Sequence, residues 1–133
     1  GLKTGDGNYV AFCCVARTSR VPTDIIELSS FSSQTGDILV PYTVWSLQKG
    51  AGRAIIKQIL NTVCQSSSAQ RVVTLSPLTE MARKFHLRNG ATEVSRNIVT
   101  ANFEYPVSAL ACDDWYQSVT TQDWTVNSSG EAV

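Results

Sequence analysis

The sequence lacks the features that mark membrane, secreted and nucleic-acid-binding chains. No run of about 18 apolar residues occurs, and the first residues lack the basic-then-apolar pattern of a secretory signal. Eleven Lys and Arg balance eleven Asp and Glu, so no net field would hold the chain on nucleic acid. We therefore expect a cytoplasmic protein with no membrane or nucleic-acid partner. Its 133 residues are expected to form a single domain, 1–133, with one core.

Histidine and cysteine are too few and too scattered for a metal centre. His86 is the single histidine, and the cysteines show no Cys-x-x-Cys spacing. We therefore predict no metal site. We interpret all four cysteines as buried, small apolar residues in preference to a disulfide. They are Cys13, Cys14, Cys64 and Cys112.

The apolar periodicity predicts an ordered core over about residues 9–105. Strands are predicted at 9–16, 25–31, 36–46, 71–76, 91–95 and 98–105. Residues 1–8 fit no element, because they are polar and glycine-rich. The polar extension, about 107–133, is predicted to add an edge strand or to lie as a tail. Trp45 is expected in the core.

The first helix is predicted to begin at the pair Gly50 and Gly52, after which apolar residues recur every four positions. The apolar pairs are Ile55/Ile56, Ile59/Leu60 and Val63/Cys64, while Arg53, Lys57 and Asn61 lie off this stripe. Glycines at a helix start let the backbone approach a ligand, and the free N–H groups there favour an anion. A tight turn without a ligand is the alternative. The loop lacks the Gly-Lys-Ser/Thr ending of a P-loop and the third glycine of a dinucleotide-binding unit.

The second helix is predicted over residues 77–90. Ser76 is expected as its N-cap, Pro77 as its first residue and Gly90 as its C-terminal stop. Its predicted buried stripe consists of Leu78, Met81, Ala82 and Phe85. The first helix connects the strands at 36–46 and 71–76, a spacing typical of a crossover between parallel neighbours.

Two segments together resemble the central motifs of the GNAT superfamily of acyl-CoA-dependent acyltransferases. They are Lys49-Gly-Ala-Gly-Arg-Ala54 and Ala82-Arg-Lys-Phe-His-Leu-Arg-Asn-Gly-Ala-Thr-Glu-Val94. The resemblance covers about residues 9–105. It implies an α/β (α+β) fold with a mixed, mostly antiparallel sheet, a central parallel pair and helices on its faces. We expect this sequence to lack the two helices that usually precede the long strands of this family, because it has only about eight residues before Tyr9.

The GNAT resemblance implies a coenzyme A site, with acetyl-CoA or another acyl-CoA as co-substrate. The pyrophosphate would lie on the N–H groups at the start of the first helix, and the pantetheine would run beside the preceding strand. His86 occupies the place of the family's tyrosine that protonates the departing thiolate, a role that suits a histidine titrating near neutrality. The implied binding residues are Val44, Trp45, Ser46, Gln48, Lys49, Gly50, Ala51, Gly52, Arg53 and Thr79.

A narrower resemblance concerns the segments Leu75-Ser-Pro77 and Phe85-His-Leu-Arg-Asn-Gly-Ala91. They are similar to two catalytic segments of malonyl-CoA decarboxylase, itself GNAT-folded, and the match implies Ser76 and His86 as catalytic residues. Geometry opposes joint action. If Ser76 caps a continuous helix bearing His86, ten steps of about 1.5 Å put them roughly 15 Å apart, too far to touch.

The sequence is compatible with three functions. The leading hypothesis is acetyl transfer from acetyl-CoA to an amine of a small molecule or a protein, with Glu27 and Glu80 as candidate bases. The first alternative is decarboxylation of malonyl-CoA or a similar acyl-CoA. The second is a non-catalytic GNAT-like binding domain, in which His86 only packs and Ser76 only caps a helix. Exposed strand edges would also favour a homodimer.

Overall fold

The computed structural model describes residues 1–5, 7–66, 69–107 and 124–126. The helices are α1 (Ile25–Ser30), α2 (Ala51–Ser66) and α3 (Glu80–Arg88). The strands are β1 (Leu2–Thr4), β2 (Tyr9–Thr18), β3 (Ile38–Ser46), β4 (Arg71–Val73), β5 (Ser76–Pro77), β6 (Thr92–Arg96), β7 (Thr100–Tyr105) and β8 (Trp124–Val126).

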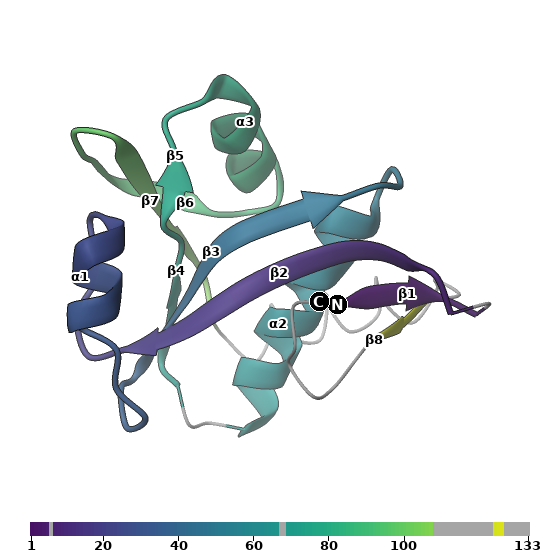
Figure 1. Ribbon diagram of the computed structural model, residues 1–133, viewed down its shortest axis with the longest axis horizontal. Helices are drawn as coiled ribbons and strands as arrows, with labels where there is room; N and C mark the ends of the chain where they lie inside the picture. The colour runs from purple at the N-terminus through teal and green to yellow at the C-terminus, as the bar shows by residue number, and fades with distance from the viewer. Residues whose placement is uncertain (6, 67–68, 108–123, 127–133) are drawn as a thin grey trace.

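One twisted sheet joins the strands (Figure 1). β2 and β3 form its long central antiparallel pair, from Ala11 opposite Ser46 to Thr18 opposite Ile38. β3 and β4 are parallel, with Ile38 opposite Arg71, as the crossover spacing predicted. β4, β5 and β6 all pair antiparallel with β7, while β1 lies between β2 and β8. The predicted mixed, mostly antiparallel sheet with one parallel pair is therefore confirmed.

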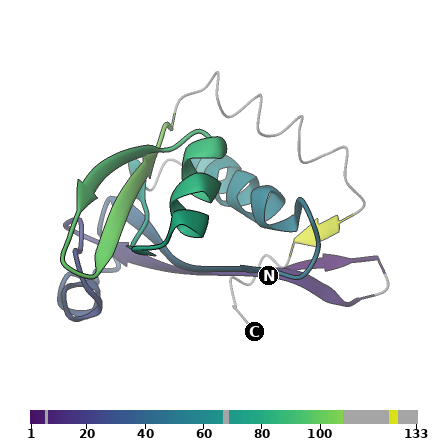
Figure 2. The same cartoon turned by 90° about the horizontal axis from the view of Figure 1, so that it is seen from above.

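The helices cover both faces of this sheet. α2 and α3 lie side by side on one face (Figure 2), over a core cluster that includes Ile56, Leu60, Val63, Val72, Phe103 and Tyr105. α1 covers the opposite face, where Leu28 packs with Ile38, Val40, Val73 and Leu75. Val72 and Val73 belong to different clusters because successive side chains of a strand point to opposite faces.

The predicted strand at residues 25–31 is wrong, because this segment forms α1. Asp24 is the N-cap, and its side chain accepts a hydrogen bond from the Glu27 backbone N at 2.7 Å. The Glu27 carboxylate reaches back to the Thr23 backbone N at 2.8 Å. This reciprocal capping satisfies donors that a helix end otherwise leaves without partners, and it outweighs the β preference of the isoleucines.

The prediction that residues 1–8 form no element is also wrong. β1 pairs with β2, and Leu2 is fully buried in a cluster with Val10 and Ala51. β8 (Trp124–Val126) pairs with β1, so this part of the extension forms an edge strand, one of the two alternatives predicted for it. Residues 108–123 and 127–133 of the predicted extension lie outside the described residues.

Several burial predictions differ from the structure. Trp45 is 43% exposed, because it lies on the face of β3 opposite to Val44, which packs under α2, and its ring contacts that of Phe12. Leu78 and Met81 are 43% and 83% exposed, since α3 begins only at Glu80 and buries His86 instead. Lys57 and Asn61, which lie off the apolar stripe of α2, are nevertheless buried.

The cysteines divide into two kinds. Cys13 is a buried free thiol and Cys14 is a partly buried one, as predicted for unpaired residues. Cys64 is disulfide-bonded, so the prediction of an unpaired cysteine is wrong there. Cys112 lies outside the described residues. None of the described helices combines the length and the hydrophobicity needed to cross a membrane.

Candidate active site

The parallel strands β3 and β4 separate soon after they meet. Their register covers Ile38 opposite Arg71 and Leu39 opposite Val72, and the Leu75 backbone N then donates to the Pro41 carbonyl oxygen at 3.0 Å. Beyond that bond β3 continues to Ser46, whereas β5 pairs with β7. The arrows of β3 and β5 therefore diverge in Figure 1. Ser76 lies on the edge of β5 that β3 has left.

The start of α2 adjoins the end of β3 and the side of α3. A Cβ atom added to Gly52 would lie 3.2 Å from Cε2 of Phe85 and 3.4 Å from Cβ of Ser46. Only glycine therefore allows this close approach without displacing the phenyl ring. Gly50 has φ of +86°, a conformation that side chains rarely adopt. The first turn of α2, with its positive dipole end, therefore lies beside the end of β3 and the side of α3.

Ser76 and His86 are in direct contact. The Ser76 Oγ lies 3.1 Å from Nε2 of His86. The prediction that a continuous helix separates them by roughly 15 Å is therefore wrong. Ser76 belongs to β5 and is not a helix cap, so the chain can turn between the two residues and lay α3 back over the strand.

Thr79 is the N-cap of α3 in place of Ser76. Its Oγ1 accepts a hydrogen bond from the Ala82 backbone N at 3.1 Å. The Thr79 backbone N donates to the Pro77 carbonyl oxygen at 2.9 Å, which closes the turn between β5 and α3. Gly90 follows the helix with φ of +100°, which agrees with its predicted place at the C-terminal stop. The helix thus starts at Glu80, three residues after Pro77, the predicted first residue.

Two further hydroxyl groups extend the Ser76–His86 contact into a network that the sequence did not predict. The Tyr105 hydroxyl lies 2.7 Å from Nδ1 of His86, and Oγ1 of Thr74 lies 2.7 Å from the Ser76 Oγ. The Phe103 backbone N donates to Thr74 Oγ1 at 3.1 Å. Strand alternation puts residues 72, 74 and 76 on the face covered by α3, together with 103 and 105 of β7.

The four side chains of this network are deeply buried and carry no charge at neutral pH. Thr74, Ser76, His86 and Tyr105 are at most 4% exposed. Burial lowers the pKa of His86 to about 4, which corrects the expectation that it titrates near neutrality. Burial also raises the pKa of Tyr105 above its usual range. Both ring nitrogens of His86 bond hydroxyl oxygens, and no described carboxylate contacts it.

Comparison with known proteins supports the fold. Neither a family model nor a curated protein matches the chain. Among solved structures, the GphF GNAT-like decarboxylase in complex with isobutyryl-CoA matches with a TM-score of 0.66. The match covers 81% of this chain and 78% of that one, at 13% sequence identity. The chain has a GNAT-like fold.

The predicted coenzyme A residues, apart from Thr79, lie at the end of β3, in the turn that follows it and at the start of α2. Val44 is partly buried, whereas Ala51 and Gly52 are buried at the start of α2. Gln48 shapes the turn, since its carbonyl oxygen accepts from both the Ser46 Oγ and the Ala51 backbone N at 3.0 Å. The remaining members are exposed, namely Trp45, Ser46, Gln48, Lys49, Gly50 and Arg53.

Asn102 anchors the strands of the site, a role that no sequence pattern indicated. Its side-chain amide nitrogen donates to the carbonyl oxygens of Thr74 at 2.8 Å and Pro22 at 2.9 Å. Its Oδ1 accepts from Ser95 Oγ at 2.6 Å and from Asn97 Nδ2 at 2.9 Å. A fully buried amide with every bond made holds β4, β7 and the loop before α1 in fixed positions.

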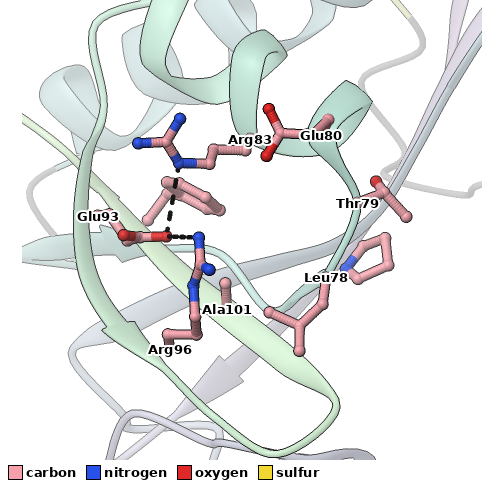
Figure 3. Close-up of a pocket in the computed structure, with 9 residues that line it drawn as sticks. Leu78, Thr79, Glu80, Arg83, Glu93, Arg96 and Ala101 are labelled. Atoms are coloured by element: carbon pink, nitrogen blue, oxygen red, sulfur yellow. Dashed lines mark hydrogen bonds and ion pairs between the residues drawn. The ribbon is translucent and has the colours of Figure 1, made fainter.

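A pocket of about 150 Å³ lies between α3 and the β6–β7 hairpin (Figure 3). Glu93 stands between two arginines on its rim, with Oε1 3.3 Å from Nη2 of Arg96 and 4.0 Å from Nε of Arg83. Thr79 also lines it. Phe103 forms part of its wall and stacks on the His86 ring, with centroids 5.2 Å apart. The predicted contact of Thr79 with coenzyme A stays a prediction.

Proposed function

We propose that this GNAT-like protein binds an acyl-CoA and removes carbon dioxide from a malonyl-type acyl group. The observation that carries the proposal is the buried contact between the Ser76 Oγ and His86 Nε2 at 3.1 Å. The matched GNAT-like decarboxylase, in complex with isobutyryl-CoA, supports the same reaction class by its fold. Decarboxylation was the alternative hypothesis from the sequence, and the contact makes it the preferred one.

The coenzyme would bind at the start of α2. Its pyrophosphate would accept hydrogen bonds from the first N–H groups of the helix, beside the exposed Lys49 and Arg53. The pantetheine would follow the edge of β3 that β4 no longer pairs with, beyond Leu39. Because Gly52 packs against Phe85, the residue before His86, this path leads towards the Ser76–His86 pair.

The reaction needs hydrogen-bond donors and little bulk water. The bond between the α-carbon and the carboxylate breaks, carbon dioxide leaves, and the electron pair moves into the thioester carbonyl as an enolate. The α-carbon then takes up one proton, supplied in the end by solvent. Ser76 and His86 can donate to the carboxylate and to the developing enolate oxygen. Their burial favours the step, since the localised charge of the carboxylate disperses as the bond breaks.

Acetyl transfer to an amine has less support from the site. A histidine with a pKa of about 4 is neutral at pH 7, so it is not the imidazolium acid that would protonate a leaving thiolate. Glu27, one candidate base, is held by the backbone N and the hydroxyl of Thr23 at the start of α1. Glu80, the other, lines the pocket beside α3.

The test is the rate of carbon dioxide release from malonyl-CoA and methylmalonyl-CoA. We expect Ser76→Ala and His86→Gln to lower the rate by about 10² or more, the usual effect of removing a preorganised hydrogen-bond donor to a developing oxyanion. Ser29→Ala, an exposed serine of α1, is the matched control and should keep the wild-type rate. Circular dichroism verifies that each variant folds. Release that is equally fast in folded His86→Gln would exclude the proposed site.

A further inference from the structure

The hydrogen bonds around His86 form one chain, which can run in either of two directions. Tyr105 can donate to Nδ1, which leaves the proton of the neutral ring on Nε2 and directed at Ser76. In the other direction Ser76 donates to Nε2, and Nδ1–H donates to Tyr105. The two directions give opposite roles to Ser76. In the first its oxygen accepts a hydrogen bond from Nε2–H, and in the second its hydroxyl donates a hydrogen bond to Nε2.

The distances favour the first direction. An O–H donor usually makes a shorter bond, near 2.7–2.8 Å, than an N–H donor, near 2.9–3.0 Å. The Tyr105 hydroxyl is 2.7 Å from Nδ1, which fits a phenol donor. The Ser76 Oγ is 3.1 Å from Nε2, which fits an N–H donor. The 2.7 Å separation between the hydroxyls of Ser76 and Thr74 fits an O–H donor as well.

We propose that Tyr105 is a positioning residue, whose hydroxyl donates to Nδ1 and holds the His86 proton on Nε2, facing Ser76. In this arrangement the Ser76 hydroxyl donates a hydrogen bond to Thr74 Oγ1 while the site is empty. The two lone pairs of Thr74 Oγ1 are filled by that bond and by the one from the Phe103 backbone N at 3.1 Å. The stacked ring of Phe103 and the edge of Phe85 keep the imidazole in this orientation.

This direction gives Ser76 the role of a hydrogen-bond donor to an anion and excludes that of a nucleophile. A nucleophilic serine needs an unprotonated imidazole nitrogen that can take its proton, and Nε2 is already protonated here. When a small carboxylate enters, the Ser76 proton can turn from Thr74 to the ligand, with His86 donating to the same oxygen. This assignment of a carboxylate as ligand rests on the proposed decarboxylase function, whereas the proton position does not.

The first experiment is ¹⁵N NMR of the imidazole in the ligand-free protein at pH 7. His86 is the only histidine, so its two ring nitrogens are the only such signals. We expect Nε2 to carry the proton and Nδ1 to have none. Tyr105→Phe keeps the buried ring but removes the donor, so the signal of the unprotonated Nδ1 should shift as this nitrogen loses its hydrogen bond. Tyr42→Phe, the same change on β3, is the control and should leave the spectrum of His86 unaltered.

A serine-directed fluorophosphonate gives the second readout. We expect no covalent labelling of Ser76, in contrast to a serine hydrolase. A wild-type protein with the proton on Nδ1, or with Ser76 labelled, would overturn the proposal even if Tyr105→Phe does not fold. A protein with the proton on Nε2 that does not decarboxylate malonyl-CoA would retain the positioning role and lose the proposed function instead.

Discussion

The buried neutral His86 makes the stability of the protein depend on pH between about 6.5 and about 4. An ordinary histidine has a pKa of about 6.5, which is the value expected in the unfolded chain. Burial lowers the pKa of His86 in the folded protein to about 4. As pH falls from 6.5 to 4 the unfolded state therefore takes up a proton that the folded state does not. The contribution of His86 to stability is complete above pH 6.5 and is lost progressively as pH falls towards 4.

The size of the loss follows from the two pKa values. At pH 5 the pH is about 1.5 units below the pKa of the unfolded histidine, so this histidine is almost fully protonated, whereas the folded one is almost entirely neutral. Protonation therefore lowers the free energy of unfolding by about 2 kcal/mol. Below pH 4 the loss levels off at about 3 kcal/mol. Burial also lowers the pKa of the amino terminus, which therefore adds its own pH dependence to the stability. The contribution of His86 is obtained by comparing the wild type with a variant that lacks the histidine.

The assay is urea unfolding of the wild type and of His86→Gln at pH 7.5 and pH 5.0, extrapolated linearly to water. We expect the free energy of unfolding of the wild type to fall by about 2 kcal/mol more than that of the variant between the two pH values. Equal falls in both proteins would refute the claim that His86 is neutral and buried in the native state, whatever the activity of the protein.

Three other substitutions test the scaffold and the coenzyme site. Asn102→Leu leaves the buried carbonyls of Thr74 and Pro22 without their donor, so urea unfolding should show a loss of about 2–4 kcal/mol, and a loss below about 1 would contradict the anchoring role. Gly90→Ala puts a side chain at φ of +100° and should cost about 1 kcal/mol of stability by the same measurement, whereas no cost would argue against the left-handed helix stop. Gly52→Val would push Phe85 aside and should weaken acetyl-CoA binding about tenfold or more in calorimetric titration. Gly5→Val, with open space around it, is its control, and equal affinities for both variants would place the coenzyme elsewhere.

The long periodic segments were predictable from the sequence. The strand ending at Ser46, the glycine turn and α2 follow each other as expected, because each carries a full apolar period and the glycines separate them. The short apolar segment of α1 was not predictable by periodicity, since six residues fit a strand as well as a helix. The signal that would have identified it is the spacing of Asp24 and Glu27, which is typical of a helix start.

The candidate site depends on contacts that sequence spacing does not contain. The contact between Ser76 and His86 requires α3 to start at Thr79 and fold back over β5, and a shift of three residues in a helix start changes a distance of roughly 15 Å into a hydrogen bond. Tyr105 reaches His86 only because β7 pairs with β4 and β5, a pairing between segments about 30 residues apart. The sequence contains both the tyrosine and the histidine, but their contact depends on how the strands of the sheet pair.

The most direct test of the proposed decarboxylase function is the mass of the thioester recovered after the wild-type protein is incubated with malonyl-CoA in heavy water. We expect acetyl-CoA that carries at least one deuterium from solvent on the former malonyl carbon, formed faster than in buffer alone. Recovery of free CoA, or of unchanged malonyl-CoA under conditions where the folded protein binds acyl-CoA, would contradict it.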